Sequence, residues 1–305
     1  MLDDSFPAMG TVARVVRDAD GGVDAQAVFD EIERRLTRFD PTSELSLLNG
    51  DPRACVPASP LLRAAVSAAL RAAHLSDGLV DPTVLDALRR CGYAESRAHV
   101  APAALLRQLG SAPARRPARP DPAARWRAIE VDHAAGLIRR PPGLELDLGG
   151  SAKGWAVDLV AARLGRYGRC AVDCGGDLRV VAGRGARAGV AWEVRVRHPL
   201  SSRPAHTLYV HEGGVATSGV DARLWVGRRG ELAHHLIDPA TGEPAWTGLL
   251  TVTALAASTL EAEALAKAAL LSGPAAARPL LEAHRGGVLI HDDGAVEPVT
   301  PLGSH

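Results

Sequence analysis

Residues 144–164 read "LELDLGGSAKGWAVDLVAARL". An apolar run is followed by Gly149 and Gly150, and a helical pattern of apolar residues begins at about Lys153. The pattern predicts a strand, a tight turn and a helix. Two interpretations of the turn stay open: it is a structural corner, or the helix N-terminus and the lysine hold an anion there. A Walker A loop is excluded because the order GxxxxGK[ST] is absent.

Outside this stretch, composition indicates an ordinary globular protein. The 305 residues are 47% hydrophobic and carry 35 basic and 35 acidic side chains. With no net charge and no basic stripe interleaved with aromatics, nucleic acid is excluded as the main partner. No apolar run approaches the roughly 20 residues of a membrane-spanning helix. The opening "MLDDSFPAMGTVARVV" has neither the basic start nor the apolar centre of a secretory leader, so we expect a cytoplasmic location.

The four cysteines are too few and too irregularly spaced for a disulfide framework or a CxxC zinc site. Cys170 and Cys174 lie four residues apart in "CAVDC", on one face of an expected strand. We therefore expect buried thiols rather than a ligand pair.

Helix and strand patterns alternate without an internal repeat, which predicts a mixed α and β architecture. We expect one domain over 1–305, with a flexible Ala/Arg/Pro-rich excursion at about 96–125. Helices are expected at 24–40 behind an Asp24 cap, 59–78, 152–164, 258–272 behind a Ser258–Glu261 capping box, and 274–285. Strands are expected at 8–17, 127–132, 136–148, 169–183, 190–198, 206–211, 223–227 and 287–291, the last leading into a "DDG" hairpin.

Three further clusters each have a structural and a functional interpretation. "DPT" at 81–83 is typical of a helix start, with Asp81 as N-cap and Pro82 as the first helical residue. "AHHLIDPATGEP" at 233–244 is typical of a type I turn capped by Asp238. "GVATSGVDARL" at 214–224 fits either a tight sheet corner or a close approach to a ligand.

The order of the motifs is more specific than any one of them. "AMGT", "SELSLLN", "DPT", "LDLGGSAKGWAVD", "VDCGGD", "VATSG", "HLIDPATGEP" and "TVTALAASTLEAEALA" together resemble, across nearly the whole chain, the ApbE family of FAD:protein FMN transferases. The resemblance implies an α+β fold in which mixed or antiparallel sheets pack with helices around an FAD cleft between sub-domains. It also implies that FAD is the substrate and that Mg²⁺ binds at the pyrophosphate. FMN is then attached to a threonine in the flavinylation motif of a partner flavoprotein, and AMP is released.

The same resemblance implies the site residues. His235 matches the histidine beside the reacting phosphate, where a base would take the threonine proton, and Asp238 matches the residue that holds its loop. His234 is expected to be a solvent or sheet residue. The Ala152 carbonyl matches a metal ligand. The positions that match cofactor-binding residues are Met9, Asp81, Thr83, Lys153, Asp158, Thr217 and Ser218.

Two positions depart from the family pattern. Where the family carries an aspartate and, four residues on, a threonine as metal ligands, this chain has Glu263 and Lys267. A protonated lysine has no lone pair for a cation, and the two side chains can pair across one helical turn. Either Lys267 turns aside and a reshaped site binds Mg²⁺, or its ammonium takes the metal's place. Two other functions therefore stay open: a non-catalytic FAD-binding protein, and an FAD pyrophosphatase giving FMN and AMP.

Overall fold

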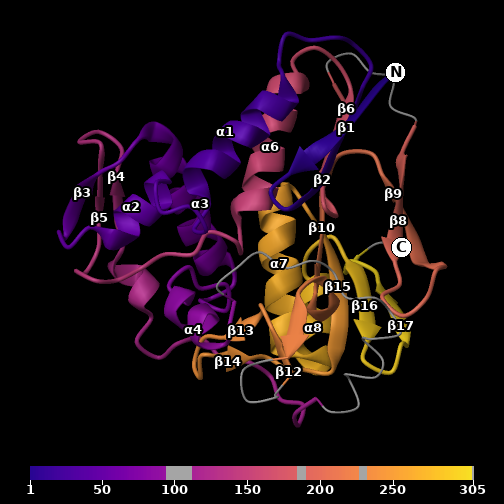
Figure 1. Cartoon of the computed structure of the whole chain (residues 1–305). Helices are drawn as coiled ribbons and strands as arrows, with labels where there is room; N and C mark the ends of the chain where they lie inside the picture. The colour runs from indigo at the N-terminus through magenta and orange to yellow at the C-terminus, as the bar shows by residue number, and fades with distance from the viewer. Residues whose placement is uncertain (94–111, 184–189, 227–231, 304–305) are drawn as a thin grey trace.

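A computed structural model describes residues 1–93, 112–183, 190–226 and 232–303. Its largest element is an eight-stranded sheet of order β1-β2-β6-β7-β10-β15-β16-β17, in which every neighbouring pair is antiparallel (Figure 1). The strands are β1 (Leu2–Ala8), β2 (Thr11–Arg17), β6 (Cys170–Cys174), β7 (Asp177–Val181), β10 (Gly213–Gly219), β15 (Leu249–Ala256), β16 (Gly287–His291) and β17 (Val296–Val299).

Smaller sheets complete the β structure. One has three strands, in the order β3-β5-β4, and β8–β9, β11–β12 and β13–β14 form pairs. Their bounds are β3 (Cys55–Pro57), β4 (Glu130–Asp132), β5 (Leu137–Arg139), β8 (Trp192–Arg197), β9 (Pro204–Val210), β11 (Leu224–Val226), β12 (Leu232–His234), β13 (Ile237–Asp238) and β14 (Glu243–Pro244).

Two long helices, α6 and α7, lie between the large sheet and the N-terminal helices (Figure 1). The helices are α1 (Ala25–Leu36), α2 (Glu44–Gly50), α3 (Pro60–Leu75), α4 (Leu85–Arg90), α6 (Ala152–Leu164), α7 (Thr259–Ser272) and α8 (Pro274–Glu282), with 3₁₀ turns at Arg125–Ala128 and Val220–Ala222. The expected caps are confirmed: Asp24 accepts from the Ala27 amide and Ser258 from the Glu261 amide. The mixed, largely antiparallel architecture is the one that the sequence predicted.

The predicted strand at 136–148 is wrong beyond β5. Pro141 and Pro142 end it, because a proline has no N–H to donate to a sheet. Residues 144–148 instead lie against the Asn49 side chain, which donates to the Leu146 carbonyl and accepts from the Leu146 amide, both at 2.8 Å. A buried asparagine thus takes the place of a neighbouring strand.

Other predicted elements differ mainly in their ends. The opening strand at 8–17 is a hairpin of β1 and β2 that turns at Met9 and Gly10, and Met9 has the unusual φ of 50°. The expected strand at 169–183 is the β6–β7 hairpin. The helix predicted over 24–40 ends at Leu36.

Part of the predicted excursion is held against the rest of the protein. The amides of Arg116 and Ala118 donate to the carbonyls of Trp246 and Leu271, each at 2.8 Å. Residues 96–111 of the excursion lie outside the described residues, so its flexibility stays a prediction.

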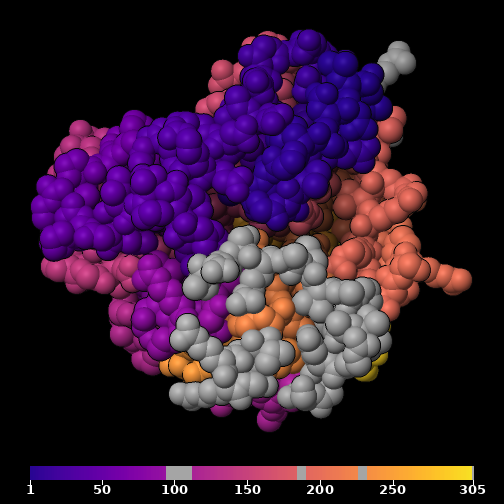
Figure 2. All heavy atoms as spheres, viewed as in Figure 1, coloured from indigo at the N-terminus to yellow at the C-terminus, as the bar shows by residue number. Residues whose placement is uncertain are grey.

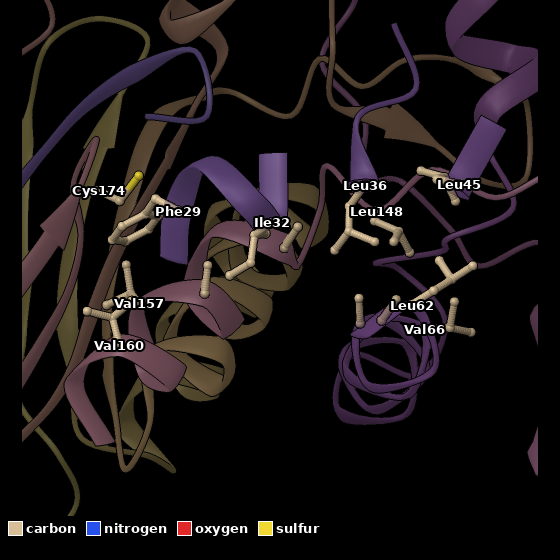
Figure 3. Packing of buried hydrophobic residues seen from close by; sticks show 14 of the residues in the cluster. Phe29, Ile32, Leu36, Leu45, Leu62, Val66, Leu148, Val157, Val160 and Cys174 are labelled. Carbon is tan, nitrogen blue, oxygen red and sulfur yellow. The ribbon is translucent and has the colours of Figure 1, made fainter. Parts of the chain in front are cut away.

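Two large apolar clusters stabilise the fold. The first joins α1, α3 and α6 to β2 and β6, and Figure 3 shows Phe29 of α1 gathered with Cys174, Val157 and Val160. The second joins α7 and α8 to β15 and β16. Cys170 and Cys174 are buried free thiols, as predicted. In the space-filling view the indigo N-terminal segment forms one side of the molecule (Figure 2).

Helices α6 and α7 cap one another. Both Asp158 oxygens accept from the first turn of α7, from the Thr259 and Leu260 amides at 2.9 Å. In return, Glu263 Oε2 of α7 accepts from the Gly154 amide of α6 at 2.9 Å. Gly154 permits this contact, because a Cβ there would lie 2.8 Å from the Thr259 carbonyl oxygen. The α6 N-terminus is therefore fixed against α7.

Replacing Asp158 with alanine is expected to lower the free energy of unfolding by about 1–2 kcal/mol, the usual cost of a lost helix cap. Urea denaturation of the variant and of Asp158→Asn, which keeps one acceptor oxygen, measures the effect. An unchanged stability together with weakened ligand binding would contradict the capping role.

Candidate functional site

A cavity of about 390 Å³ lies where the two apolar clusters meet. Its wall combines the β1–β2 turn, the end of α1, the 79–84 segment, the start of α6, the 235–237 segment and one face of α7. The site residues that line it are Met9, Asp81, Ala152, Lys153, His235 and Lys267. Segments from both halves of the chain thus form one pocket, as expected for a cleft between sub-domains.

The corner at 147–153 is a tight turn that also forms part of the cavity wall. Asp147 Oδ1 accepts from the Gly149 amide at 2.9 Å, and its Oδ2 pairs with Arg38 at 2.7 Å in a largely buried contact. Gly150 packs closely against Val80, because a Cβ added at Gly150 would lie 3.4 Å from Val80 Cγ1. This turn brings the first residues of α6 to the cavity wall.

The "DPT" motif forms a turn rather than the predicted helix start. Asp81 Oδ1 accepts from the Thr83 amide and hydroxyl, both at 2.7 Å, and α4 begins only at Leu85. Asp81 Oδ2 is buried and has no partner among the described residues. Burial raises the pKa of this carboxyl. Asp81 therefore lines the cavity with one carboxyl oxygen unpaired among the described residues, and Thr83 binds the other oxygen.

His235 also lines the cavity and is half-buried. Its Nδ1 is buried and has no partner within the described part of the chain. Burial, together with the charge of Arg223, lowers the pKa of His235 well below its usual value. The imidazole is consequently neutral at physiological pH and able to accept a proton.

Asp238 holds the loop that carries this histidine. Its Oδ1 accepts from the Arg119 amide at 3.0 Å and from the Ala240 amide at 3.1 Å. The neighbouring His234 is a sheet residue, one of the two expected environments, but it is fully buried. Its ring packs on Trp246 with centroids 4.5 Å apart, and burial lowers its pKa to about 3.

Four predicted cofactor residues lie outside the cavity lining: Thr83, Asp158, Thr217 and Ser218. Asp158 is occupied by the α7 amides. Thr217 and Ser218 lie on β10, where the Thr217 hydroxyl bonds that of Thr253 at 2.8 Å. Ser218 Oγ is buried without a partner in the described residues. A ligand contact is therefore not supported for Asp158, whose tertiary partner the sequence pattern did not reveal.

Arg223 lines the cavity beside His235, and the sequence interpretation missed it. It follows the "TSG" motif in a stretch read as a sheet corner, and nothing local distinguished it from the chain's many other arginines. Its guanidinium lies 5.9 Å from the centroid of the Tyr93 ring, which packs near His235. It adds a positive charge to the wall that carries the candidate base.

Four charged side chains meet at the N-terminal end of α6. Lys153 pairs with the buried Asp177 and lies 3.5 Å from Glu263 Oε1, and Lys267 donates to the same oxygen at 2.8 Å. Although burial opposes its charge, the attraction of Asp177 and Glu263 raises the pKa of Lys153. Burial raises the pKa of Asp177 to about 6 despite the lysine. For Glu263, the two lysines outweigh burial and lower the pKa.

This arrangement does not fit a magnesium ion. Magnesium needs oxygen ligands about 2.0–2.1 Å away in octahedral geometry. Glu263 is fully buried, and its two oxygens already accept from the Gly154 amide and from Lys267. Among the described residues, no group of three or more His, Cys, Asp or Glu side chains could hold a metal. Lys267 lines the cavity and its ammonium donates to Glu263; that it takes the place of the metal stays a prediction.

The chain is similar to flavin transferases and ApbE proteins, both in sequence and in fold. The chain is 29% identical to an FAD:protein FMN transferase of Chlamydia trachomatis over 71% of its own length and 64% of the relative's, and 28% identical to one of Vibrio cholerae over 96% and 89%. Its fold matches the ApbE protein of Thermotoga maritima with a TM-score of 0.77, 24% identity and coverage of 98% and 96%. The Pseudomonas stutzeri flavinyl transferase ApbE matches with a TM-score of 0.72, 24% identity and coverage of 98% and 95%.

Within the described residues, no helix combines the length and apolar character that crossing a membrane requires.

A family model covers residues 9–290, from the β1–β2 turn to β16. The predicted motifs fall inside this span and line one cavity at six positions. The chain belongs to the ApbE family.

Proposed function

We propose that the protein transfers the FMN half of FAD to a threonine hydroxyl of a partner flavoprotein and releases AMP. The observation that carries the proposal is the meeting of a neutral His235 with Lys153 and Lys267 in one cavity. The curated relatives named as FAD:protein FMN transferases support the same reaction.

In this reaction the threonine Oγ attacks the phosphorus of the FMN half. The bond from that phosphorus to the bridging oxygen breaks, and AMP leaves with the bridging oxygen. A threonine hydroxyl is a weak nucleophile, so a base that takes its proton assists the attack. His235 Nδ1 accepts this proton in the tautomer that carries its hydrogen on Nε2.

The charged side chains stabilise what the attack produces. Negative charge grows on the phosphoryl oxygens and on the departing AMP, and fixed positive groups already in place lower its energy. Lys153, Lys267 and Arg223 line the cavity in positions to supply that charge. The unpaired oxygen of Asp81 would accept from a hydroxyl or N–H of the flavin half, which orients it.

The acceptor is expected to carry a threonine in a flavinylation motif, and the reaction is expected to occur in the cytoplasm.

One incubation distinguishes transfer from its alternatives. Purified protein is mixed with FAD and an acceptor flavoprotein bearing such a threonine. AMP is measured by chromatography, and the acceptor by intact mass spectrometry. We expect AMP and an acceptor heavier by one FMN unit. AMP with free FMN and an unchanged acceptor would instead identify a pyrophosphatase, and bound FAD without AMP a non-catalytic flavin-binding protein.

A further inference from the structure

The chain holds only two lysines, and both line the same cavity. All the other basic residues among its 35 are arginines, so Lys153 and Lys267 are the exceptions. They come from α6 and α7, and their ammonium groups approach one oxygen of Glu263, at 3.5 and 2.8 Å. Such a distribution sets the pocket apart from the rest of the protein.

An ammonium differs from a guanidinium in ways that matter at this place. It is a compact point charge with three donors, whereas the arginine head group is a broad planar fork. Lys267 gives one donor to Glu263 and Lys153 gives one to Asp177, which leaves donors on both groups. Their side chains keep 11% and 20% of their surface exposed, and both belong to the cavity wall. The remaining donors can therefore meet a ligand.

The charges of the cluster are balanced before any ligand arrives. Two ammonium groups face two carboxylates, those of Asp177 and Glu263, which are 1% and 0% exposed. The buried carboxylates fix the lysines in place. The first turn of α6 adds its partial positive charge on the same side.

We propose that Lys267, together with Lys153, occupies the place of a divalent cation in this pocket and binds the pyrophosphate of FAD without Mg²⁺. The inference rests on the proposed function, since it assumes FAD as the ligand. It follows from the position of the Lys267 ammonium on Glu263, where a cation would have to bind.

The scarcity of lysine allows a direct test on the unmodified chain. Labelling with ¹⁵N,¹³C-lysine gives two side-chain signals in an NMR spectrum, which single substitutions assign. We expect both signals to shift when FAD is added and neither to broaden when paramagnetic Mn²⁺ is added. The dissociation constant of FAD, from flavin fluorescence, should be the same in EDTA and in Mg²⁺.

Variants of Lys267 and Glu263 test how the affinity for FAD depends on the lysine charge and on Mg²⁺. Lys267→Met removes the charge without supplying an oxygen, so FAD should bind about 10- to 100-fold more weakly, the equivalent of one lost hydrogen bond to a charged group, with or without Mg²⁺. The double variant Glu263→Asp with Lys267→Thr supplies oxygen ligands. Its FAD affinity should fall in EDTA and recover in Mg²⁺.

Broadening of either lysine signal by Mn²⁺, or weaker FAD binding by the wild-type chain in EDTA, would overturn the inference and leave the proposed function standing. Failure of FAD to bind under every condition would overturn both. The two failures are therefore separable.

Discussion

Replacing His235 with alanine is expected to slow FMN transfer by a factor on the order of 10²–10⁴, the usual contribution of a general base. The reason is that the His235 imidazole is the neutral group in the cavity with an unpartnered ring nitrogen, as judged from the described residues. Because the side chain is only half-buried and lines a cavity, the free energy of unfolding should change by less than about 1 kcal/mol. Single-turnover rates and urea denaturation measure the two quantities.

The pH dependence gives a second signature of the same residue. A base must be unprotonated, and the pKa of His235 lies well below its usual value because of burial and Arg223. Transfer should therefore persist as the pH falls through about 6.5, the ordinary histidine pKa, instead of losing half its rate there. His133→Ala is the matched control, since His133 is exposed on the β4–β5 turn. A His235→Ala variant that transfers normally per folded molecule would exclude the base.

Replacing Glu263 with alanine is expected to cost about 3 kcal/mol of stability, at the lower end of the range for breaking a buried ion pair. The change leaves Lys267 without its carboxylate and deprives the Gly154 amide of its acceptor. The cost stays at the lower end because Lys267 faces the cavity, where water can solvate it. Urea denaturation with an unchanged m-value would measure the loss.

A second ion pair of the same sequence spacing is the control. Arg278 and Glu282 of α8 also lie four residues apart, with 2.9 Å between the charged groups, but Arg278 is 54% exposed. Glu282→Ala should cost less than about 1 kcal/mol, as solvent-exposed pairs do. Replacing both Glu263 and Lys267 with methionine should recover much of the loss, since a buried pair can often be exchanged for apolar groups. Equal losses at Glu263 and Glu282 would contradict a special role for the buried cluster.

Local sequence rules predicted the features that depend on neighbours along the chain. The Asp24 and Ser258 caps formed as expected, because a cap needs only a side chain within one helical turn of an open amide. The contact of Glu263 with Lys267 has the same origin, since residues four apart share a helix face. The motif order also identified the family and the mixed fold.

The interpretation of the sequence was wrong for features whose partners lie far along the chain. Asp158 resembled a ligand residue, yet both of its carboxylate oxygens accept hydrogen bonds from amides of α7. The apolar run at 144–148 resembled a strand, yet its backbone pairs with the side chain of Asn49. No periodicity within either segment carries information about these contacts.

The electrostatics of the pocket likewise depend on tertiary structure. The sequence by itself determined that the chain has two lysines, one at the start of α6 and one in α7, and that the second lies over Glu263. Only folding brought Lys153 to the carboxylates of Asp177 and Glu263 and placed His235 near the charge of Arg223. A pKa and a binding charge depend on burial and on distances through space, and those are fixed when α6, α7 and the 235–237 segment pack around one cavity.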